Sequence, residues 1–135
     1  AGTELETFAK AIAAQGGDPA VCDDLSLLPQ AVAGHEVKAA DGGTIRRVAT
    51  RELGLLSIEI GCGRARKDDV VDPASGFRIL KKTGETVEAG EPLVVVELGP
   101  KTSLPKGYAE RLAACWEIGD AAGAPPPLPF VVETL

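Results

Sequence analysis

The first fifteen residues show the apolar spacing of an amphipathic helix. The apolar positions are Leu5, Phe8, Ala9, Ile12 and Ala13. They recur at intervals of three and four residues, which predicts a helix over residues 3–15. Thr3 and Glu6 stand at the spacing of a capping box, and Gly16-Gly17 offer the left-handed stop that commonly ends a helix. Asp18-Pro19 then predicts the cap and first residue of a short helical turn.

From Gly34 the pattern changes to short strands separated by turns. Residues 37–40 and 44–49 flank Asp41-Gly42-Gly43, and this arrangement predicts a β-hairpin. Residues 51–60 return to helical spacing. The residues expected on the apolar side of that helix are Leu53, Leu55, Leu56 and Ile60.

The second half of the chain alternates strands with turns and then returns to a helix. Residues 76–80 and the aliphatic run 93–98 are expected strands, and the second is apolar enough to be covered on both faces. Residues 108–118 have helical spacing, and 125–127 and 130–132 predict a stiff proline spacer and an edge strand. The inward side chains of the 108–118 helix are expected to be Leu112, Cys115, Trp116 and Ile118. This order of elements predicts an α+β fold, not a doubly wound parallel sheet.

The composition fits one small domain, or one domain with an attached fragment. The chain has 135 residues, of which 44% are hydrophobic and 25% charged, and its net charge is −6. An acidic chain has no general affinity for nucleic acid or for anionic membranes, and no apolar run reaches the roughly 20 residues of a membrane span. Cys22, Cys62 and Cys115 are odd in number and widely spaced, which indicates reduced thiols in a cytoplasmic protein and no structural metal site.

Three observations suggest that the chain is a fragment of a longer one. It contains no methionine, it opens inside an expected helix, and His35 is its only histidine. Little of the titratable chemistry of a stand-alone enzyme is therefore present. We expect His35 to face solvent, since no serine-hydrolase or metalloenzyme motif accompanies it, and Cys62 to be a small buried residue.

The basic stretch after the 51–60 helix has two interpretations. A phosphate-binding loop opens a helix, whereas Gly61-Cys62-Gly63 closes one, so the polarity is wrong for that motif. Arg64, Arg66 and Lys67 could still form an anion clamp. The alternative is a structural Arg64 that pairs with Asp68, Asp69 or Asp72, and the neighbouring acidic residues favour it. The predicted structural motif consists of Gly61, Gly63, Arg64, Asp69 and Asp72.

Residues 99–107, with the sequence GPKTSLPKG, are rich in turn formers and poor in apolar side chains. Little opposes the conformational entropy of such a segment, so it is predicted to be the most mobile internal loop. The preceding strand pattern is also similar to biotinyl and lipoyl carrier domains. However, Lys101 follows a proline and lacks the flanking residues of a modified lysine, so the carrier chemistry is not supported.

Several ordered motifs together resemble the C-terminal part of thymidine phosphorylase and pyrimidine-nucleoside phosphorylase. The segments that carry the resemblance are FAKAIAAQGGDP, the run from Val37 to Glu97, and YAERLAACWEIGD. Within them the family pattern is met at Gln15 to Gly17, Asp41-Gly42, Leu53-Gly54, Gly61, Gly63, Arg64, Lys67, Asp69, Asp72, Gly76, Lys82, Gly84, Val87 and Gly90 to Leu93. Ile60 stands where the family usually has leucine. The likeness covers nearly the whole chain.

The resemblance implies a hammerhead, barrel-sandwich-like C-terminal domain of an enzyme. Such enzymes cleave thymidine, and in some members uridine, with inorganic phosphate as co-substrate and no cofactor. They are homodimers with a helical domain and an α/β domain upstream. Residues 1–33 would then end the α/β domain, 34–120 would be the α+β domain, and 121–135 a proline-rich tail.

The resemblance places no catalytic or substrate-binding residue in this chain, because the family's phosphate and base contacts lie upstream. The expected role is to brace the α/β domain and to assist closure of the cleft. The closure-loop candidates are Gly99, Pro100, Lys101, Pro105 and Gly107. Thymidine preference and broad pyrimidine specificity both stay open. A free-standing hammerhead binding module and a carrier domain are the alternatives from other functional classes.

Overall fold

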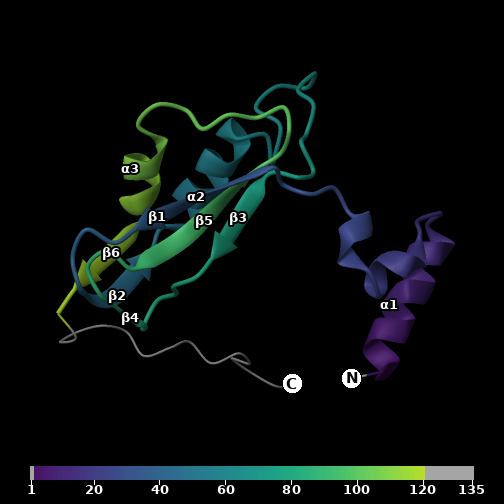
Figure 1. The fold of residues 1–135 in the computed structure, drawn as a ribbon, viewed down its shortest axis with the longest axis horizontal. Coiled ribbons are helices and arrows are strands. Elements are labelled where there is room, and N and C mark those ends of the chain that lie inside the picture. The colour runs from purple at the N-terminus through teal and green to yellow at the C-terminus, as the bar shows by residue number, and fades with distance from the viewer. Residues whose placement is uncertain (1, 121–135) are drawn as a thin grey trace. The chain divides into compact units, whose positions relative to one another are not determined.

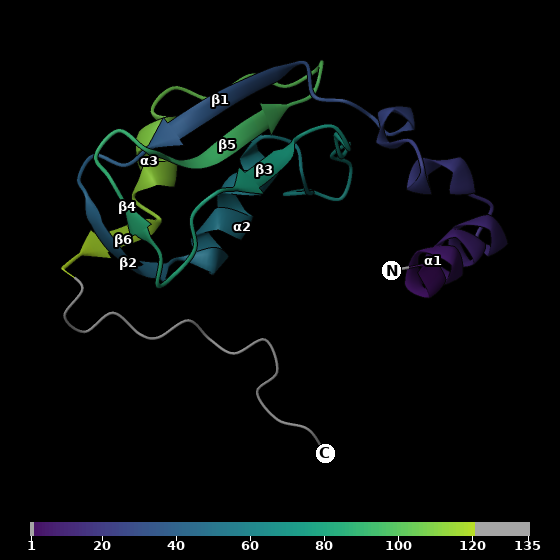
Figure 2. The same ribbon diagram turned by 60° about the horizontal axis from the view of Figure 1, so that its bottom comes forward.

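The computed structural model describes residues 2–120, and the chain separates into two compact units (Figures 1 and 2). Residues up to Gln30 form the first unit and those from Ala31 onwards the second. The spacer expected at 125–127 and the edge strand expected at 130–132 lie outside the described residues.

The first unit is a helix followed by two short 3₁₀ turns. Its helix α1 spans Gly2–Ala14 and has no buried residue. Because α1 begins before Thr3, this threonine lies inside the helix, and its hydroxyl donates to Glu4. The predicted capping box is therefore wrong. The glycine stop is confirmed, since Gly16 adopts a φ of +81°.

The two 3₁₀ turns are both capped by aspartates. η1 spans Pro19–Cys22, and the Asp18 carboxylate accepts from the amide of Ala20 at 2.9 Å. η2 spans Leu25–Leu27. The predicted Asp18-Pro19 start is thus confirmed, whereas no helical turn was predicted at η2.

Between residues 31 and 120, the second unit consists of two three-stranded antiparallel sheets and two helices, α2 (Thr50–Glu59) and α3 (Tyr108–Ala113). The strands are β1 (Ala33–Lys38), β2 (Gly43–Val48), β3 (Gly76–Ile79), β4 (Thr86–Val87), β5 (Pro92–Leu98) and β6 (Trp116–Gly119). One sheet has the order β1-β5-β3 and the other β4-β2-β6. Both sheets and both helices contribute to one apolar core. The α+β class is confirmed.

The predicted hairpin between residues 37–40 and 44–49 is wrong. β1 pairs with β5, and β2 pairs with β4 and β6, so the two neighbouring strands lie in different sheets (Figure 2). Two-residue hairpin turns of types I′ and II′ both require positive φ at the first central residue, which would be Asp41 or Gly42, and neither of these has it. The connection between β1 and β2 instead runs beside the turn before β5. There the amide of Ala39 donates to the backbone carbonyl of Glu91 at 2.9 Å.

The helix predicted over residues 108–118 ends early. α3 stops at Ala113, and the next residues form β6, which pairs Trp116 with Val48 and Gly119 with Thr44. Trp116 is buried, Glu117 exposed and Ile118 half-buried, which is the alternation of a strand. Trp116 and Ile118 fit either a helical or a strand period, so the apolar pattern of residues 116–119 does not distinguish a helix from a strand.

The helix predicted over 51–60 is confirmed by α2, with its boundaries one residue earlier. Leu53, Leu56 and Ile60 are buried as expected, whereas Leu55 is 51% exposed and lies on the outer side. None of the helices in residues 2–120 has both the length and the apolar character that crossing a membrane requires.

A buried tyrosine connects the two helices of the second unit. The Tyr108 hydroxyl donates to the carbonyl of Leu56 at 2.6 Å. That carbonyl is one of the last four of α2, which lack a partner further along the helix. We expect Tyr108→Phe to lower the free energy of unfolding by about 1–3 kcal/mol, because it leaves a buried acceptor unsatisfied. Urea unfolding measures the change.

Ser57→Ala is the matched control for Tyr108→Phe. The Ser57 hydroxyl also donates to an α2 carbonyl, that of Gly54, but at the surface. Its loss should change the free energy of unfolding by less than about 0.5 kcal/mol. Equal effects of the two substitutions would show that the tyrosine hydroxyl has no special role.

Candidate functional site

The loop between α2 and β3 begins at a glycine turn. Gly61 has a φ of +86°, which confirms it as the end of the helix. Its carbonyl accepts from the amide of Asp72 at 2.8 Å, so the loop folds back on its own start. A Cβ at Gly61 would lie 3.2 Å from the Cβ of Asp72, which leaves little room for a side chain there.

Asp72 holds this loop together. Its Oδ1 accepts from the amide of Ala74 and its Oδ2 from the hydroxyl of Thr102, both at 3.0 Å. The Ala74 amide is the main cause that lowers the pKa of Asp72; Thr102, Ser75 and the charge of Lys101 add to it, and partial burial opposes it. The ionised carboxylate is therefore the form that the fold stabilises.

The loop after β5 meets the same aspartate. Gly99 is buried, and its amide donates to the hydroxyl of Ser75 at 2.9 Å. The Thr102 amide in turn donates to the carbonyl of Gly99 at 3.2 Å. Asp72, Ser75, Gly99 and Thr102 thus form one hydrogen-bonded unit, the Asp72 junction, which joins the 60–75 loop to the 99–107 loop.

The ion pair expected for Arg64 is not formed. Asp69 accepts from the amides of Ala65 and Arg66, at 3.0 and 2.7 Å, and Asp72 is occupied at the junction. Arg64 is exposed and takes part in no ion pair within residues 2–120. The predicted pairing of Arg64 with a neighbouring aspartate is wrong. A short aspartate side chain reaches the backbone amides beside it more readily than it reaches the end of a long arginine side chain.

The closure-loop candidates occupy different environments. Pro100 and Lys101 are exposed, Pro105 accepts from the amide of Tyr108 at 3.1 Å, and Gly107 has a φ of +70° just before α3. Leu104 lies half-buried against the core. It is the leucine within GPKTSLPKG, so the sequence could have indicated this contact. The mobility of this loop stays a prediction.

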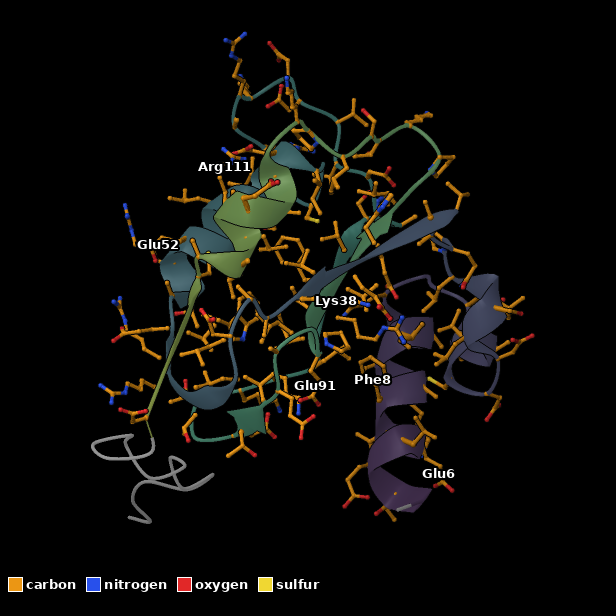
Figure 3. All side chains as sticks on the ribbon, turned by 60° about the vertical axis from the view of Figure 1, so that its left-hand side comes forward. Glu6, Phe8, Lys38, Glu52, Glu91 and Arg111 are labelled. Atoms are coloured by element: carbon orange, nitrogen blue, oxygen red, sulfur yellow. The ribbon has the colours of Figure 1, made fainter. Side chains whose placement is uncertain are left out.

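A hollow of about 560 Å³ lies between the two loops. Lys101, Thr102 and Ser103 line one side of it, and Asp69 and Glu59 line the other. Glu59 is already paired with Arg111, which projects from α3 beside α2 (Figure 3). The hollow therefore offers the Lys101 ammonium group and the Ser103 hydroxyl, because the Thr102 hydroxyl already donates to Asp72 and the carboxylates of Asp69 and Glu59 have partners.

The other singled-out residues form no further site. His35 is exposed on β1, in agreement with the expectation. Cys62 is half-buried against the core; desolvation, then the charge of Asp72, raises the pKa of its thiol, which lowers its reactivity. Within residues 2–120, no three histidine, cysteine or acidic side chains come close enough together to hold a metal ion.

Sequence reasoning missed the partners of Asp72. Thr102 lies 30 residues after Asp72 in the sequence, and Ser75 lies three residues after it. Neither residue belongs to a local motif. The only available signal was Gly99, a glycine that directly follows an aliphatic strand and precedes a proline. Its reason is steric, since it leaves space for the Asp72 carboxylate.

Gly99→Ala should break the junction. A Cβ at residue 99 would lie well inside contact distance of both Asp72 carboxylate oxygens. The carboxylate could move only by giving up Thr102 and Ala74, so we expect a loss of about 1–3 kcal/mol in the free energy of unfolding. Gly76→Ala is the control, because a Cβ there meets no atom within 4 Å. Urea unfolding measures both variants. Equal losses in the free energy of unfolding would contradict the steric account.

Asp72→Asn tests the electrostatic part of the junction through pH. The native pKa lies below the ordinary 3.8, so the ionised carboxylate adds stability above that pH and loses it as the pH falls through the native pKa. The variant should unfold at lower urea concentration than the unsubstituted chain at about pH 7, and the gap should narrow as the pH falls below the ordinary pKa of 3.8. The matched control is Asp68→Asn, an exposed position without a hydrogen bond among the described residues, and it should unfold at the same urea concentration as the unsubstituted chain at about pH 7.

The comparisons with known proteins agree on one family. The family described as "Pyrimidine nucleoside phosphorylase C-terminal domain" matches residues 44–119, more than half of the chain. The pyrimidine-nucleoside phosphorylases of Bacillus subtilis (strain 168) and Geobacillus stearothermophilus are 41% and 40% identical over 95 residues. That of Staphylococcus haemolyticus is 37% identical over the same length. These 95 residues are 70% of this chain and 22% of each relative, so the chain spans about a fifth of the length of the curated relatives it matches. This chain belongs to the family of pyrimidine nucleoside phosphorylase C-terminal domains.

Proposed function

We propose that this chain is the C-terminal part of an enzyme that cleaves a pyrimidine nucleoside with inorganic phosphate. The observation that carries the proposal is the family match over residues 44–119, which runs from β2 to β6. The products would be the free base and a pentose 1-phosphate. Thymidine is the proposed substrate, and no metal or organic cofactor is needed for a displacement by phosphate.

The role proposed for the chain itself is support, not catalysis. It covers 22% of the length of relatives that are named as pyrimidine-nucleoside phosphorylases. The matching family is described as the C-terminal domain of such enzymes. Its first unit supplies a surface for support. Phe8, Leu25 and Leu27 are 61%, 69% and 53% exposed, which is unusual for large apolar side chains on adjacent elements. We propose that the upstream α/β domain of the parent covers them.

Three further features belong to the same proposal. The 99–107 loop would take part in closing the cleft, since the Asp72 junction ties its start to the domain and leaves Lys101 and Lys106 exposed. The parent would be a cytoplasmic homodimer, assembled through its upstream domains. It would bind neither nucleic acid nor membranes, in keeping with a net charge of −6.

The decisive experiment compares the 135-residue chain with the complete polypeptide from the same gene. Both are incubated with phosphate and either thymidine or uridine, and the release of free base is followed. We expect release by the complete polypeptide and none by the chain. Release by the purified chain would contradict the supporting role, and no release by a folded complete polypeptide would contradict the proposed reaction. The ratio of the two nucleoside rates gives the specificity.

A further inference from the structure

The Asp72 junction makes each of its two loops depend on the other for hydrogen-bond partners. The amide of the buried Gly99 donates to the Ser75 hydroxyl at 2.9 Å, and the Thr102 hydroxyl donates to Asp72 at 3.0 Å. A buried amide and a carboxylate oxygen would both lose a partner if the loops separated, and each such loss costs free energy. Breaking the contact between the loops therefore affects both of them.

The same contacts determine the shape of the 60–75 loop. The Asp72 amide donates to the Gly61 carbonyl at 2.8 Å, so the start and the end of this loop meet at the junction. Thr102 lies against both points, because its hydroxyl oxygen binds Asp72 and would lie 3.4 Å from a Cβ at Gly61. One residue of the 99–107 loop thus contacts the place where the 60–75 loop closes on itself.

The two ends of the 99–107 loop are anchored differently. At its C-terminal end Leu104 packs half-buried against the core, and Tyr108, directly after the loop, is fully buried. At its N-terminal end the anchor is the polar Asp72 junction, in which three of the four residues are only half-buried. Polar contacts that water can replace open more readily than buried apolar ones. Opening at the junction, with Leu104 still in place, is therefore the easiest local motion of these loops.

We propose that residues 60–75 and 99–103 open and close as one cooperative unit, the double loop, whose closed state is held by the Asp72 junction. In the open state both hydrogen bonds between the loops are broken together, while Leu104 keeps the rest of the second loop on the core. The hollow of about 560 Å³ belongs to the closed state, because residues of both loops line it.

The double loop is a property of this chain and holds whatever reaction the parent catalyses. One consequence alone rests on the proposed function: if the 99–107 loop takes part in closing the cleft, the 60–75 loop moves with it. Hydrogen exchange measured on the 135-residue chain separates the two, because a negative result there would leave phosphorolysis by the complete polypeptide untouched.

Amide hydrogen exchange of the 135-residue chain, followed by NMR, tests the double loop. The reporters are four hydrogen-bonded amides, two in each loop: Asp72, Ser75, Gly99 and Thr102. We expect the four to show the same protection factor and the same dependence on urea, with protection lower than that of the β5 amides. Different protection in the two loops, or protection equal to that of β5, would overturn the proposal.

Asp69→Ala tests whether opening of one loop requires opening of the other. The Asp69 carboxylate accepts from the amides of Ala65 and Arg66 in its own loop, and among the described residues it has no hydrogen bond to the 99–107 loop. If the loops open as one, a less stable 60–75 loop also opens its partner more often. The protection of the Gly99 and Thr102 amides should therefore fall about tenfold.

Asp68→Ala is the matched control, since this neighbouring aspartate is exposed and has no hydrogen bond within residues 2–120. It should leave the protection of all four reporter amides unchanged. If Gly99 and Thr102 keep their protection in Asp69→Ala, the 99–103 segment opens on its own and the proposal is overturned. Equal effects of the two substitutions would also overturn it, because the loss would then come from the charge and not from the fold of the loop.

Discussion

Burial of the strand β5 determines the arrangement of the second unit. Five of its residues are buried: Leu93, Val94, Val95, Val96 and Leu98. Each such side chain contributes roughly 1.5–3 kcal/mol when removed from water, and the buried backbone must find hydrogen-bond partners on both sides. β1 and β3 provide those partners. Because β1 is used in this way, β2 pairs instead with β4 and β6, and the chain builds two sheets where a local hairpin was expected.

The Asp72 junction follows from the register of the same sheet. In the antiparallel pairing of β3 with β5, Gly76 lies opposite Glu97. The residues just before β3 and just after β5 therefore meet at the same end of the sheet. This brings Ser75 and Asp72 next to Gly99 and Thr102. The absence of a side chain at Gly99 leaves the space that the carboxylate fills. A choice of strand register thus positions two loops that are remote in sequence.

Local signals in the sequence predicted the elements well, and their pairing poorly. The end of α2 at Gly61 and the apolar strand β5 each depend on a few consecutive residues, and both are confirmed. The hairpin failed because burial of β5 outweighed a favourable turn sequence. β6 was missed because Trp116 and Ile118 fit two periods, and only pairing with β2 decides between them. In the candidate site the Asp72 amide donates to the Gly61 carbonyl, whereas the side-chain partners of Asp72 depend on tertiary register, which no motif records.

The failure of the predicted Arg64 ion pair shows how this domain divides its charges. An aspartate side chain is short and readily satisfies backbone amides within a few residues, so Asp69 and Asp72 shape the loop that carries them. The Arg64 guanidinium forms no ion pair within residues 2–120 and is exposed to solvent, where water largely offsets the cost of leaving it unpaired. This loop thus uses two aspartates to fix its geometry and leaves Arg64, Arg66 and Lys67 exposed and without an ion pair in the part of the chain that the structure describes.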